Sequence, residues 1–158
     1  MNNTIIIYSL LNFLILFLCG KISYKLNLLD HPNKRKIHTS ATAYTGGVAI
    51  SIILLFSIFL FEVSDKNLNI TLSTAFLISI IGLIDDKYNL DVSSKLSLQI
   101  IPIFYLVVFE NLALQQIGDY NYFKVELGSF AIPFTLMCVL LLINAFNYFD
   151  GIDGTLGF

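Results

Sequence analysis

Five long apolar stretches, separated by short polar segments, most constrain what this chain can fold into. They cover roughly residues 5–20, 46–63, 68–84, 92–109 and 130–149. A helix needs about 20 apolar residues to cross a hydrocarbon core about 30 Å thick, and each stretch comes close to that length. Hydrophobic residues make up 56% of the chain and charged residues 13%, too apolar a balance for one water-soluble core. We therefore predict an all-α, polytopic membrane protein with about five transmembrane helices in a single domain, residues 1–158.

The distribution of Lys and Arg predicts an orientation. With five crossings, the first loop, the third loop and the C-terminal end share one side, which carries seven of these residues against two on the other side. Cationic loops favour the cytoplasm, so we expect an outside N-terminus and a cytoplasmic C-terminus in the inner (plasma) membrane. The outer segment 111–129 alternates apolar and polar residues on both sides of residues 119–121, which favours a short hairpin. The net charge of −2 gives no indication of nucleic-acid binding.

A cluster of polar residues follows the last apolar stretch. Within residues 144–154 stand two carboxamides, two carboxylates and two glycines. On a helix, Asn147, Asp150 and Asp153 share a face because residues three and four apart are neighbours. Oxygen ligands grouped in this way suit Mg²⁺, which binds through one or two carboxylates together with substrate phosphates. A membrane helix that ends in solvated polar residues with a glycine cap explains the stretch equally well.

A second polar cluster occupies the first cytoplasmic loop. Three basic residues, Lys34, Arg35 and Lys36, and His38 precede Gly46 and Gly47 at the start of the next apolar stretch. Such a cluster usually serves only as a positive-inside signal. However, the free N–H groups at the start of a helix also favour an anion.

A third cluster ends the middle apolar stretch with two adjacent acids, Asp85 and Asp86. Adjacent helical residues point in different directions, so one acid can face a site while the other faces water. The pair is either a stop signal at the interface or a carboxylate at phosphate depth, acting as a base or near a metal. Because all three clusters fall on one predicted side of the membrane, we favour a shared site on the cytoplasmic face.

In order and spacing, these motifs resemble those of the polyprenyl-phosphate N-acetylhexosamine-1-phosphate transferases of glycosyltransferase family 4. Members carry Asp-x-Pro-x-x-Arg-Lys-x-His, then Pro-x-x-Gly-Gly, then Asp-Asp-x-x-x-Leu, then Asn-x-x-Asn-x-x-Asp-Gly-x-Asp-Gly-Leu. The matching residues here are Asp30, Pro32, Arg35, Lys36, His38, Gly46, Gly47, Asp85, Asp86, Leu90, Asn144, Asn147, Asp150, Gly151, Asp153 and Gly154. Ala43 and Thr155 depart from the pattern, where the family has Pro and Leu. The resemblance covers the N-terminal half of such an enzyme, and we expect these 158 residues alone to be inactive.

The resemblance implies a reaction. A UDP-N-acetylhexosamine, most often UDP-N-acetylglucosamine, transfers its sugar 1-phosphate to undecaprenyl or another polyprenyl phosphate, and UMP is released. This step initiates the synthesis of lipid-linked cell-envelope glycans, and a homodimer is compatible with it. Phosphoryl transfer of this kind depends mainly on positioning and charge neutralisation. Direct attack and a covalent aspartyl-phosphate both remain open.

The resemblance also implies roles for individual residues. Asn147 is the ligand for Mg²⁺, with Mn²⁺ as the alternative ion. Asp85 deprotonates or orients the lipid phosphate with Asp86 beside it, and these two are the catalytic candidates. The predicted substrate-binding residues are Arg35, Lys36, His38, Gly46, Gly47, Asn144, Asp150 and Asp153.

Three alternatives stay open. The first is a phospho-N-acetylmuramoyl-pentapeptide transferase, which uses a different UDP-sugar. The second is a non-catalytic fragment. The third is a small membrane carrier, although carrier sites usually lie near the bilayer midplane, whereas these acids fall at helix ends.

Overall fold

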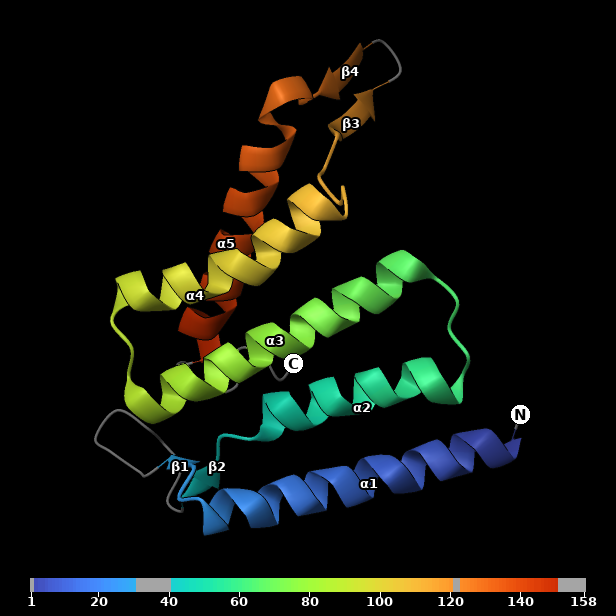
Figure 1. The fold of residues 1–158 in the computed structure, drawn as a ribbon, viewed down its shortest axis with the longest axis vertical. Helices are drawn as coiled ribbons and strands as arrows, with labels where there is room; N and C mark the ends of the chain where they lie inside the picture. The colour runs from blue at the N-terminus through green and yellow to red at the C-terminus, as the bar shows by residue number, and fades with distance from the viewer. Residues whose placement is uncertain (1, 31–40, 121–122, 151–158) are drawn as a thin grey trace. The chain divides into compact units, whose positions relative to one another are not determined.

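The computed structural model describes residues 2–30, 41–120 and 123–150. The chain forms two compact units, Met1–Lys95 and Leu96–Phe158, which are treated separately below. Both units consist mainly of apolar helices (Figure 1), which confirms the predicted fold class.

Three helices build the first unit: α1 (Asn2–Lys25), α2 (Gly46–Leu60) and α3 (Lys66–Tyr88). Helix α2 packs against both α1 and α3, and the three lie side by side in Figure 1. Each helix runs opposite to the one before it. The end of α1, the start of α2 and the end of α3 therefore meet at one end of this unit, which we call the basic end because four lysines lie there. These are Lys21, Lys25, Lys87 and Lys95.

A small antiparallel sheet closes the connection between α1 and α2. Strand β1 (Leu29–Asp30) pairs with β2 (Thr42–Ala43), and Leu29 lies opposite Ala43. The hydroxyl of Ser23, which is fully buried, donates to the carbonyl of Leu28 at 2.5 Å. The two ends of the intervening loop are thereby held together at the basic end of the unit.

Helix α3 has defined caps at both ends. The side chain of Asp65 accepts a hydrogen bond from the backbone N–H of Leu68 at 3.1 Å, as expected for an N-cap carboxylate. At the other end Asn89 adopts a left-handed conformation with φ of 49°. Asn is one of the few non-glycine residues that enters this region readily, so α3 stops just after its two acids.

Helix α4 (Val92–Phe104) leads into a π-helical turn, η1 (Tyr105–Phe109). Pro102 lies inside α4, where its ring removes a backbone N–H and crowds the preceding turn. The widened turn begins three residues later, where the hydrogen-bond ladder is re-formed with a different spacing. Both Pro102 and Gln99 are buried, so this face of α4 is turned towards other parts of the protein.

The second unit continues with a β-hairpin and a final helix. Strands β3 (Gln116–Tyr120) and β4 (Phe123–Glu126) are antiparallel, as the sequence predicted, and an exposed ion pair joins Asp119 to Lys124 at 3.1 Å. A short 3₁₀ turn, η2 (Gly128–Phe130), precedes α5 (Ala131–Asp150). The hydroxyl of Thr135 in α5 accepts from the backbone N–H of Leu114 at 2.8 Å and ties the segment before β3 to this helix.

Four helical segments among the described residues are long and apolar enough to cross a membrane. They are Thr4–Lys25, Lys66–Tyr88, Val92–Phe109 and Gly128–Tyr148. The remaining predicted stretch, residues 46–63, forms α2. This helix is shorter, at 15 residues, because the chain leaves the helix at Phe61 and Glu62 takes a positive φ. The helices thus match the prediction of about five, with one of reduced length.

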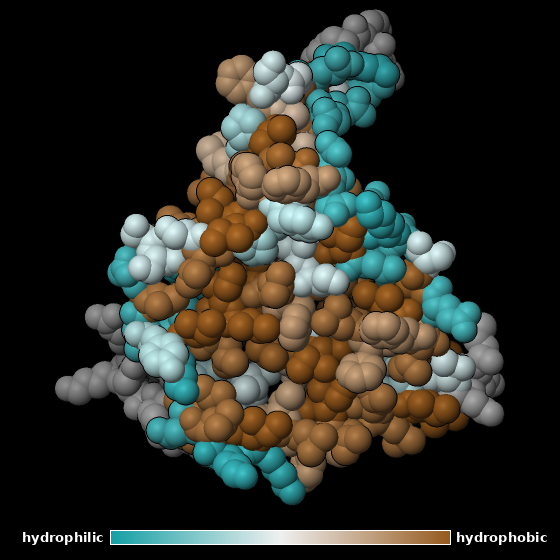
Figure 2. Space-filling view, viewed as in Figure 1, coloured by the Kyte–Doolittle hydropathy of each residue, from teal (hydrophilic) through white to brown (hydrophobic). Residues whose placement is uncertain are grey.

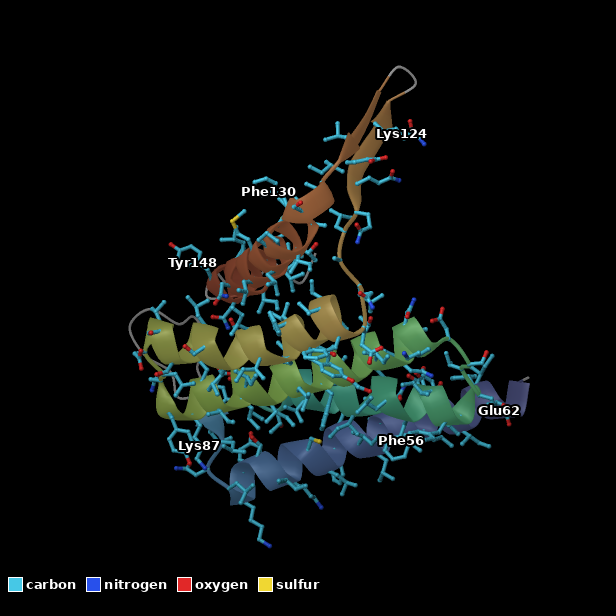
Figure 3. All side chains as sticks on the ribbon, turned by 45° about the horizontal axis from the view of Figure 1, so that its top comes forward. Phe56, Glu62, Lys87, Lys124, Phe130 and Tyr148 are labelled. Atoms are coloured by element: carbon cyan, nitrogen blue, oxygen red, sulfur yellow. The ribbon has the colours of Figure 1, made fainter. Side chains whose placement is uncertain are left out.

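The surface of these helices is strongly apolar. Phe13, Phe59 and Phe130 are each more than 70% exposed, and hydrophobic side chains cover most of the helical surface in Figure 2. Hydrophilic side chains gather on the β3–β4 hairpin, and charged ones such as Glu62 and Lys87 lie at helix ends (Figure 3). This distribution, with apolar middles and polar ends, is what a bilayer requires of a spanning helix.

Candidate functional site

Two of the three polar clusters meet at the basic end of the first unit. Gly46 and Gly47 begin α2, and Asp85 and Asp86 lie in the last turn of α3. The loop with Arg35, Lys36 and His38 leaves and re-enters this end through β1 and β2, but those three residues lie outside the described part of the chain. The start of α2 and the end of α3 thus lie at the same end of this unit (Figure 1).

Asp85 forms a close ion pair with Lys95. The distance from Lys95 Nζ to Asp85 Oδ2 is 2.5 Å, and each side chain is only 14% exposed. Lys95 lies in the first turn of α4, directly after the tight connection that Asn89 initiates. An ammonium and a carboxylate this close and this shielded interact more strongly than an exposed pair.

Lys95 was one of the seven cationic residues that predicted the orientation, and no other role was predicted for it. A three-residue connection, 89–91, separates the acid-bearing end of α3 from the start of α4. Such a short connection forces the two helix ends together, so an acid in one last turn and a cation in the next first turn are natural partners. The spacing of Asp85 and Lys95 was therefore a usable signal.

The two adjacent acids occupy different environments. Asp85 is partly buried in the ion pair, whereas Asp86 is exposed on another face of α3. Next to them, the ammonium of Lys87 lies 5.4 Å from the centre of the Tyr88 ring, a cation–π distance. Figure 3 shows Lys87 at this end of α3. The expectation that the two acids point in different directions agrees with this arrangement.

Gly46 and Gly47 are exposed in the first turn of α2. The hydroxyl of Thr45, at the N-cap position, makes no cap bond and instead donates to the carbonyl of Cys19 at 3.2 Å. A Cβ atom built on either glycine would meet nothing within 4 Å. Packing within the described residues therefore does not require glycine at these two positions.

In the second unit, Asn144 bonds within the protein. Its amide Nδ2 donates to Gln99 Oε1 at 2.9 Å and to the carbonyl of Leu140 at 2.8 Å. Asn147 lies one turn further along α5 and is exposed. The helix ends at Asp150, whose side chain lies outside the described residues, as does all of Asp153.

A magnesium site is only partly represented among the described residues. Nowhere in residues 2–30, 41–120 and 123–150 do three His, Cys, Asp or Glu side chains form a group that could hold a metal. Asn147, an exposed residue near the end of α5, carries an amide oxygen, a ligand of the type that Mg²⁺ accepts. The chemistry of that donor fits the ion, while the predicted neighbouring carboxylates fall outside the described part.

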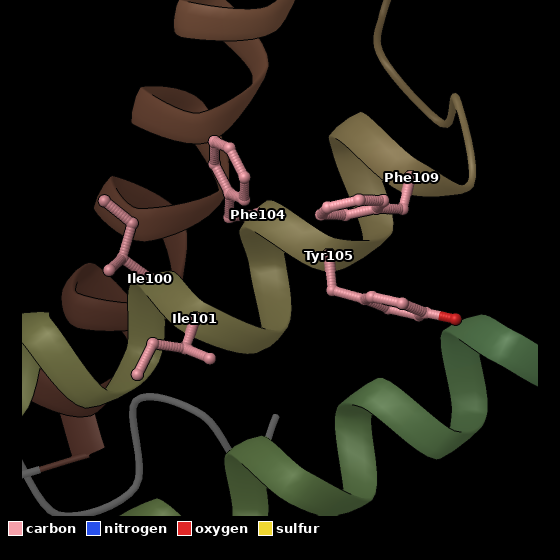
Figure 4. Close-up of a pocket in the computed structure, with 5 residues that line it drawn as sticks. All are labelled: Ile100, Ile101, Phe104, Tyr105 and Phe109. Atoms are coloured by element: carbon pink, nitrogen blue, oxygen red, sulfur yellow. The ribbon is translucent and has the colours of Figure 1, made fainter.

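One surface recess of about 360 Å³ is formed by α4 and η1 alone (Figure 4). Its lining residues are apolar or aromatic: Ile100, Ile101, Phe104, Tyr105 and Phe109. The only hydroxyl among them, that of Tyr105, donates to Glu110 Oε1 at 2.9 Å. The recess therefore offers a contact for an apolar chain and no reactive group.

Asp91 caps the start of α4, between the two acids of α3 and Lys95. Its carboxylate accepts hydrogen bonds from the side chain of Ser94 at 2.6 Å and from the backbone N–H of Ser94 at 3.1 Å. These bonds favour the ionised form, and they lower the pKa of Asp91 below its ordinary value. A negative charge is thus kept at the N-terminus of α4, where the helix dipole favours it.

Comparison with known proteins gives one family and several relatives. The family described as Glycosyl transferase family 4 matches residues 68–158. The undecaprenyl-phosphate alpha-N-acetylglucosaminyl 1-phosphate transferase of Escherichia coli (strain K12) is 32% identical over 145 residues, 91% of this chain and 40% of the relative. The protein of the same name from Yersinia pestis is 29% identical over 158 residues, 99% of this chain and 43% of its own length.

A more distant organism supplies a similar match. The probable undecaprenyl-phosphate N-acetylglucosaminyl 1-phosphate transferase of Bacillus subtilis (strain 168) is 29% identical over 151 residues, 94% of this chain and 42% of its own length. The chain thus spans about 40% of the length of the curated relatives it matches. No solved structure matches the chain.

Proposed function

Because the chain belongs to glycosyl transferase family 4, we propose that it forms part of an enzyme that transfers N-acetylglucosamine 1-phosphate from UDP-N-acetylglucosamine to undecaprenyl phosphate. An oxygen of the lipid phosphate attacks the β-phosphorus of the nucleotide sugar. The bond between that phosphorus and the bridging oxygen breaks, and UMP leaves with the electron pair. The product is a lipid-linked pyrophosphate sugar. The observation that carries this proposal is the match along nine-tenths of the chain to relatives named for this activity.

The basic end of the first unit is the part of the site that these residues supply. Asp85 is proposed to orient or deprotonate the lipid phosphate, with Asp86 beside it, and Lys95 joins them as a cation that the incoming phosphate can contact. A phosphate that approaches Lys95 competes with Asp85 for the same ammonium, because both are anions within reach of one cation. Substrate arrival would thereby release Asp85 from its ion pair. Arg35, Lys36 and His38 are proposed to attract phosphates from the adjoining loop.

The remaining proposed groups lie on and after α5. Asn147 is proposed to contribute an oxygen ligand to Mg²⁺ or Mn²⁺, and Asp150 and Asp153 to hold the nucleotide or the metal. The bound ion would supply charge neutralisation for the phosphates. Gly46 and Gly47 are proposed to let a phosphate approach the free N–H groups at the start of α2, which their exposure permits.

The proposed orientation places this chemistry where both substrates can reach it. The basic end of the first unit carries four lysines, and Lys66 lies at the opposite end. By the positive-inside rule the basic end faces the cytoplasm, where the nucleotide sugar is dissolved. The lipid phosphate lies at the interface, at the depth of the helix ends.

A chimera tests the proposal. This chain replaces the matching 145 residues of the E. coli K12 relative, and membranes containing the chimera are assayed for transfer from UDP-N-acetylglucosamine, UDP-N-acetylgalactosamine or the UDP-muramoyl-pentapeptide to undecaprenyl phosphate. We expect Mg²⁺-dependent product with UDP-N-acetylglucosamine. Asp85→Asn should lower kcat by at least about 100-fold with little change in nucleotide binding, because it removes the charge at the reacting centre. Glu62→Gln, an exposed acid beyond the end of α2, is the matched control and should leave the rate unchanged.

Two outcomes would overturn parts of this proposal. A chimera that inserts and binds UDP-N-acetylglucosamine, yet forms no lipid-linked product from any of the three nucleotides, contradicts the activity. Near-normal turnover in Asp85→Asn together with an inactive Asp86→Asn reverses the assignment of the two acids. Preferential use of the muramoyl-pentapeptide nucleotide would place the enzyme in the alternative substrate class.

A further inference from the structure

A hydrogen bond between two carboxamides links α4 to α5 inside the second unit. Gln99 Oε1 on α4 accepts from Asn144 Nδ2 on α5 at 2.9 Å, across 45 residues of sequence. Gln99 is 2% exposed, although its neighbours on both sides, Leu98 and Ile100, are exposed apolar residues. A polar side chain buried within an apolar helix is costly unless it is bonded, so this contact holds the two helices in one arrangement.

Asn144 has no amide hydrogen left for a ligand. An Asn amide carries two donor hydrogens, and both are used within the protein, one by Gln99 and one by the carbonyl of Leu140. The second bond runs back one turn along α5 and fixes the direction of the amide. A substrate that needed a donor from Asn144 would have to break one of these two bonds.

We propose that Gln99 and Asn144 form an interhelical latch that positions the C-terminal turns of α5, and that Asn144 is a positioning residue instead of a substrate ligand. Asn147 follows Asn144 by three residues and lies on the same side of the helix, and Asp150 ends the helix one turn further along. An α-helix rises about 1.5 Å per residue, which puts them within about 10 Å of the latch along a stiff element. Fixing Asn144 against α4 therefore also fixes the backbone positions of Asn147 and Asp150.

The functional consequence rests on the proposed function, whereas the latch itself does not. If α5 carries groups that hold the nucleotide or the metal, a misplacement of about 1 Å can lower the rate on the order of 100-fold. Gln99, which no family motif in this sequence includes, then becomes as important to turnover as Asn144. The two residues should act as one unit, because either one alone leaves its partner without its bond.

The structural test uses the whole chain in lipid nanodiscs, with Cys19→Ala and Cys138→Ala removing both native thiols. Spin labels go on Leu98→Cys and Phe146→Cys, two exposed positions, one on each helix. We expect one narrow distance distribution by pulsed electron paramagnetic resonance. Gln99→Leu and Asn144→Leu should each broaden it, and Gln99→Met gives a second variant with an unbranched, adaptable side chain. Gln115→Leu is the matched control, because this Gln is exposed and its side chain donates to the nearby Ala113 carbonyl, at 3.3 Å, and not to another helix among the described residues.

The kinetic test uses the chimera described above. Gln99→Leu and Asn144→Leu should lower kcat by similar factors, about 10- to 100-fold, with a smaller change in the KM for the UDP-sugar, and the double variant should be no worse than either single one. An unchanged distance distribution in both Gln99 variants overturns the latch. A large rise in KM confined to Asn144→Leu, with Gln99→Leu unaffected, makes Asn144 a substrate ligand and overturns the positioning role. If the chimera forms no product, that result counts against the proposed function alone. The distance measurement then still decides whether the latch exists.

Discussion

Two helices that carry candidate site residues, α3 and α5, are joined to their neighbours by different chemistry. In the first unit the link from the acid-bearing end of α3 to the start of α4 is ionic, between Asp85 and Lys95. In the second unit α5 is joined to α4 and to the segment before β3 by neutral hydrogen bonds, from Asn144 to Gln99 and from Leu114 to Thr135. The ionic link lies at a helix terminus, whereas the carboxamide link lies within apolar helices.

The difference follows from the cost of burying charge. An ion moved into a low-dielectric interior loses far more solvation than an amide does, so charged pairs are confined to positions near water. A neutral amide pair can be placed deeper because each partner satisfies the other. The ion pair of Asp85 and Lys95 therefore lies near a helix terminus, while the carboxamide pair of Gln99 and Asn144 can hold two helices together within their apolar length.

The largest effect is expected from a test of which end of each unit faces the cytoplasm. Single cysteines at Thr39, between β1 and β2 in the sequence, and at Asp119, in the β-hairpin of the second unit, are compared in a background without Cys19 and Cys138. In intact cells an impermeant thiol reagent should label the Asp119 site and spare the Thr39 site, because cationic loops stay inside. Permeabilised cells provide the control, in which both sites should react. Labelling of the Thr39 site from outside would reverse the proposed orientation and remove the site from the compartment of the nucleotide.

The helices were predictable from the sequence because hydropathy and length are local properties. The hairpin was predictable too, since residues 119–121 separate two alternating runs. The shortened α2 was not, because its end depends on the backbone conformation of Glu62 and on the cap that Asp65 provides for the next helix. The π turn of η1 was also missed, although Pro102 marked the place where the ladder had to change.

A smaller effect is expected from the neutral link between the hairpin segment and α5. Thr135→Val keeps the shape of the side chain but removes the oxygen that accepts from the backbone N–H of Leu114. Thr135 is 9% exposed but Leu114 is 47% exposed, so the N–H loses its partner in a partly shielded place, which should cost about 1 kcal/mol. The measurements are the apparent unfolding midpoint in detergent and the hydrogen-exchange rate of the Leu114 amide.

The matched control for that change lies in the first unit. Thr71 is exposed on α3 and bonds only back along its own helix, to the carbonyl of Asn67 at 2.7 Å. Thr71→Val should therefore shift the midpoint by less than about 0.5 kcal/mol, as surface substitutions usually do. Equal effects of the two substitutions would show that the second unit does not depend on its neutral links, and the contrast between the units would fail.

The positions of the candidate residues at helix ends were more predictable than their contacts. Spacing and helix ends placed Asp85 with Gly46 and Gly47 at one end of the first unit. The ion partner of Asp85 and the carboxamide partner of Asn144 were missed, because a partner on another helix depends on how two helices face each other. Gln99 is a carboxamide within the apolar stretch predicted over residues 92–109. A carboxamide in a buried position needs a hydrogen-bond partner, so Gln99 could have indicated a carboxamide on the next helix, such as Asn144.

The smallest effect is expected at the cap of α4, where the charge lies entirely in water. Hydrogen bonds from the Ser94 side chain and backbone lower the pKa of Asp91 in the folded chain. A lowered folded pKa means that the stabilisation is complete above the ordinary Asp pKa of about 3.9 and is lost as the pH falls through the folded value.

Asp91→Ala should therefore lower the apparent unfolding midpoint by at most about 2 °C at pH 6, and the difference from the unmodified chain should shrink as the pH falls below about 4. Asp91→Asn keeps a capping oxygen but has no titrating charge. The difference between its unfolding midpoint and that of Asp91→Ala should therefore stay nearly constant over the same pH range. A difference between the unmodified chain and Asp91→Ala that grows on acidification would mean that the protonated acid is the better cap. The ionic character assigned to this helix end of the first unit would then not extend to Asp91.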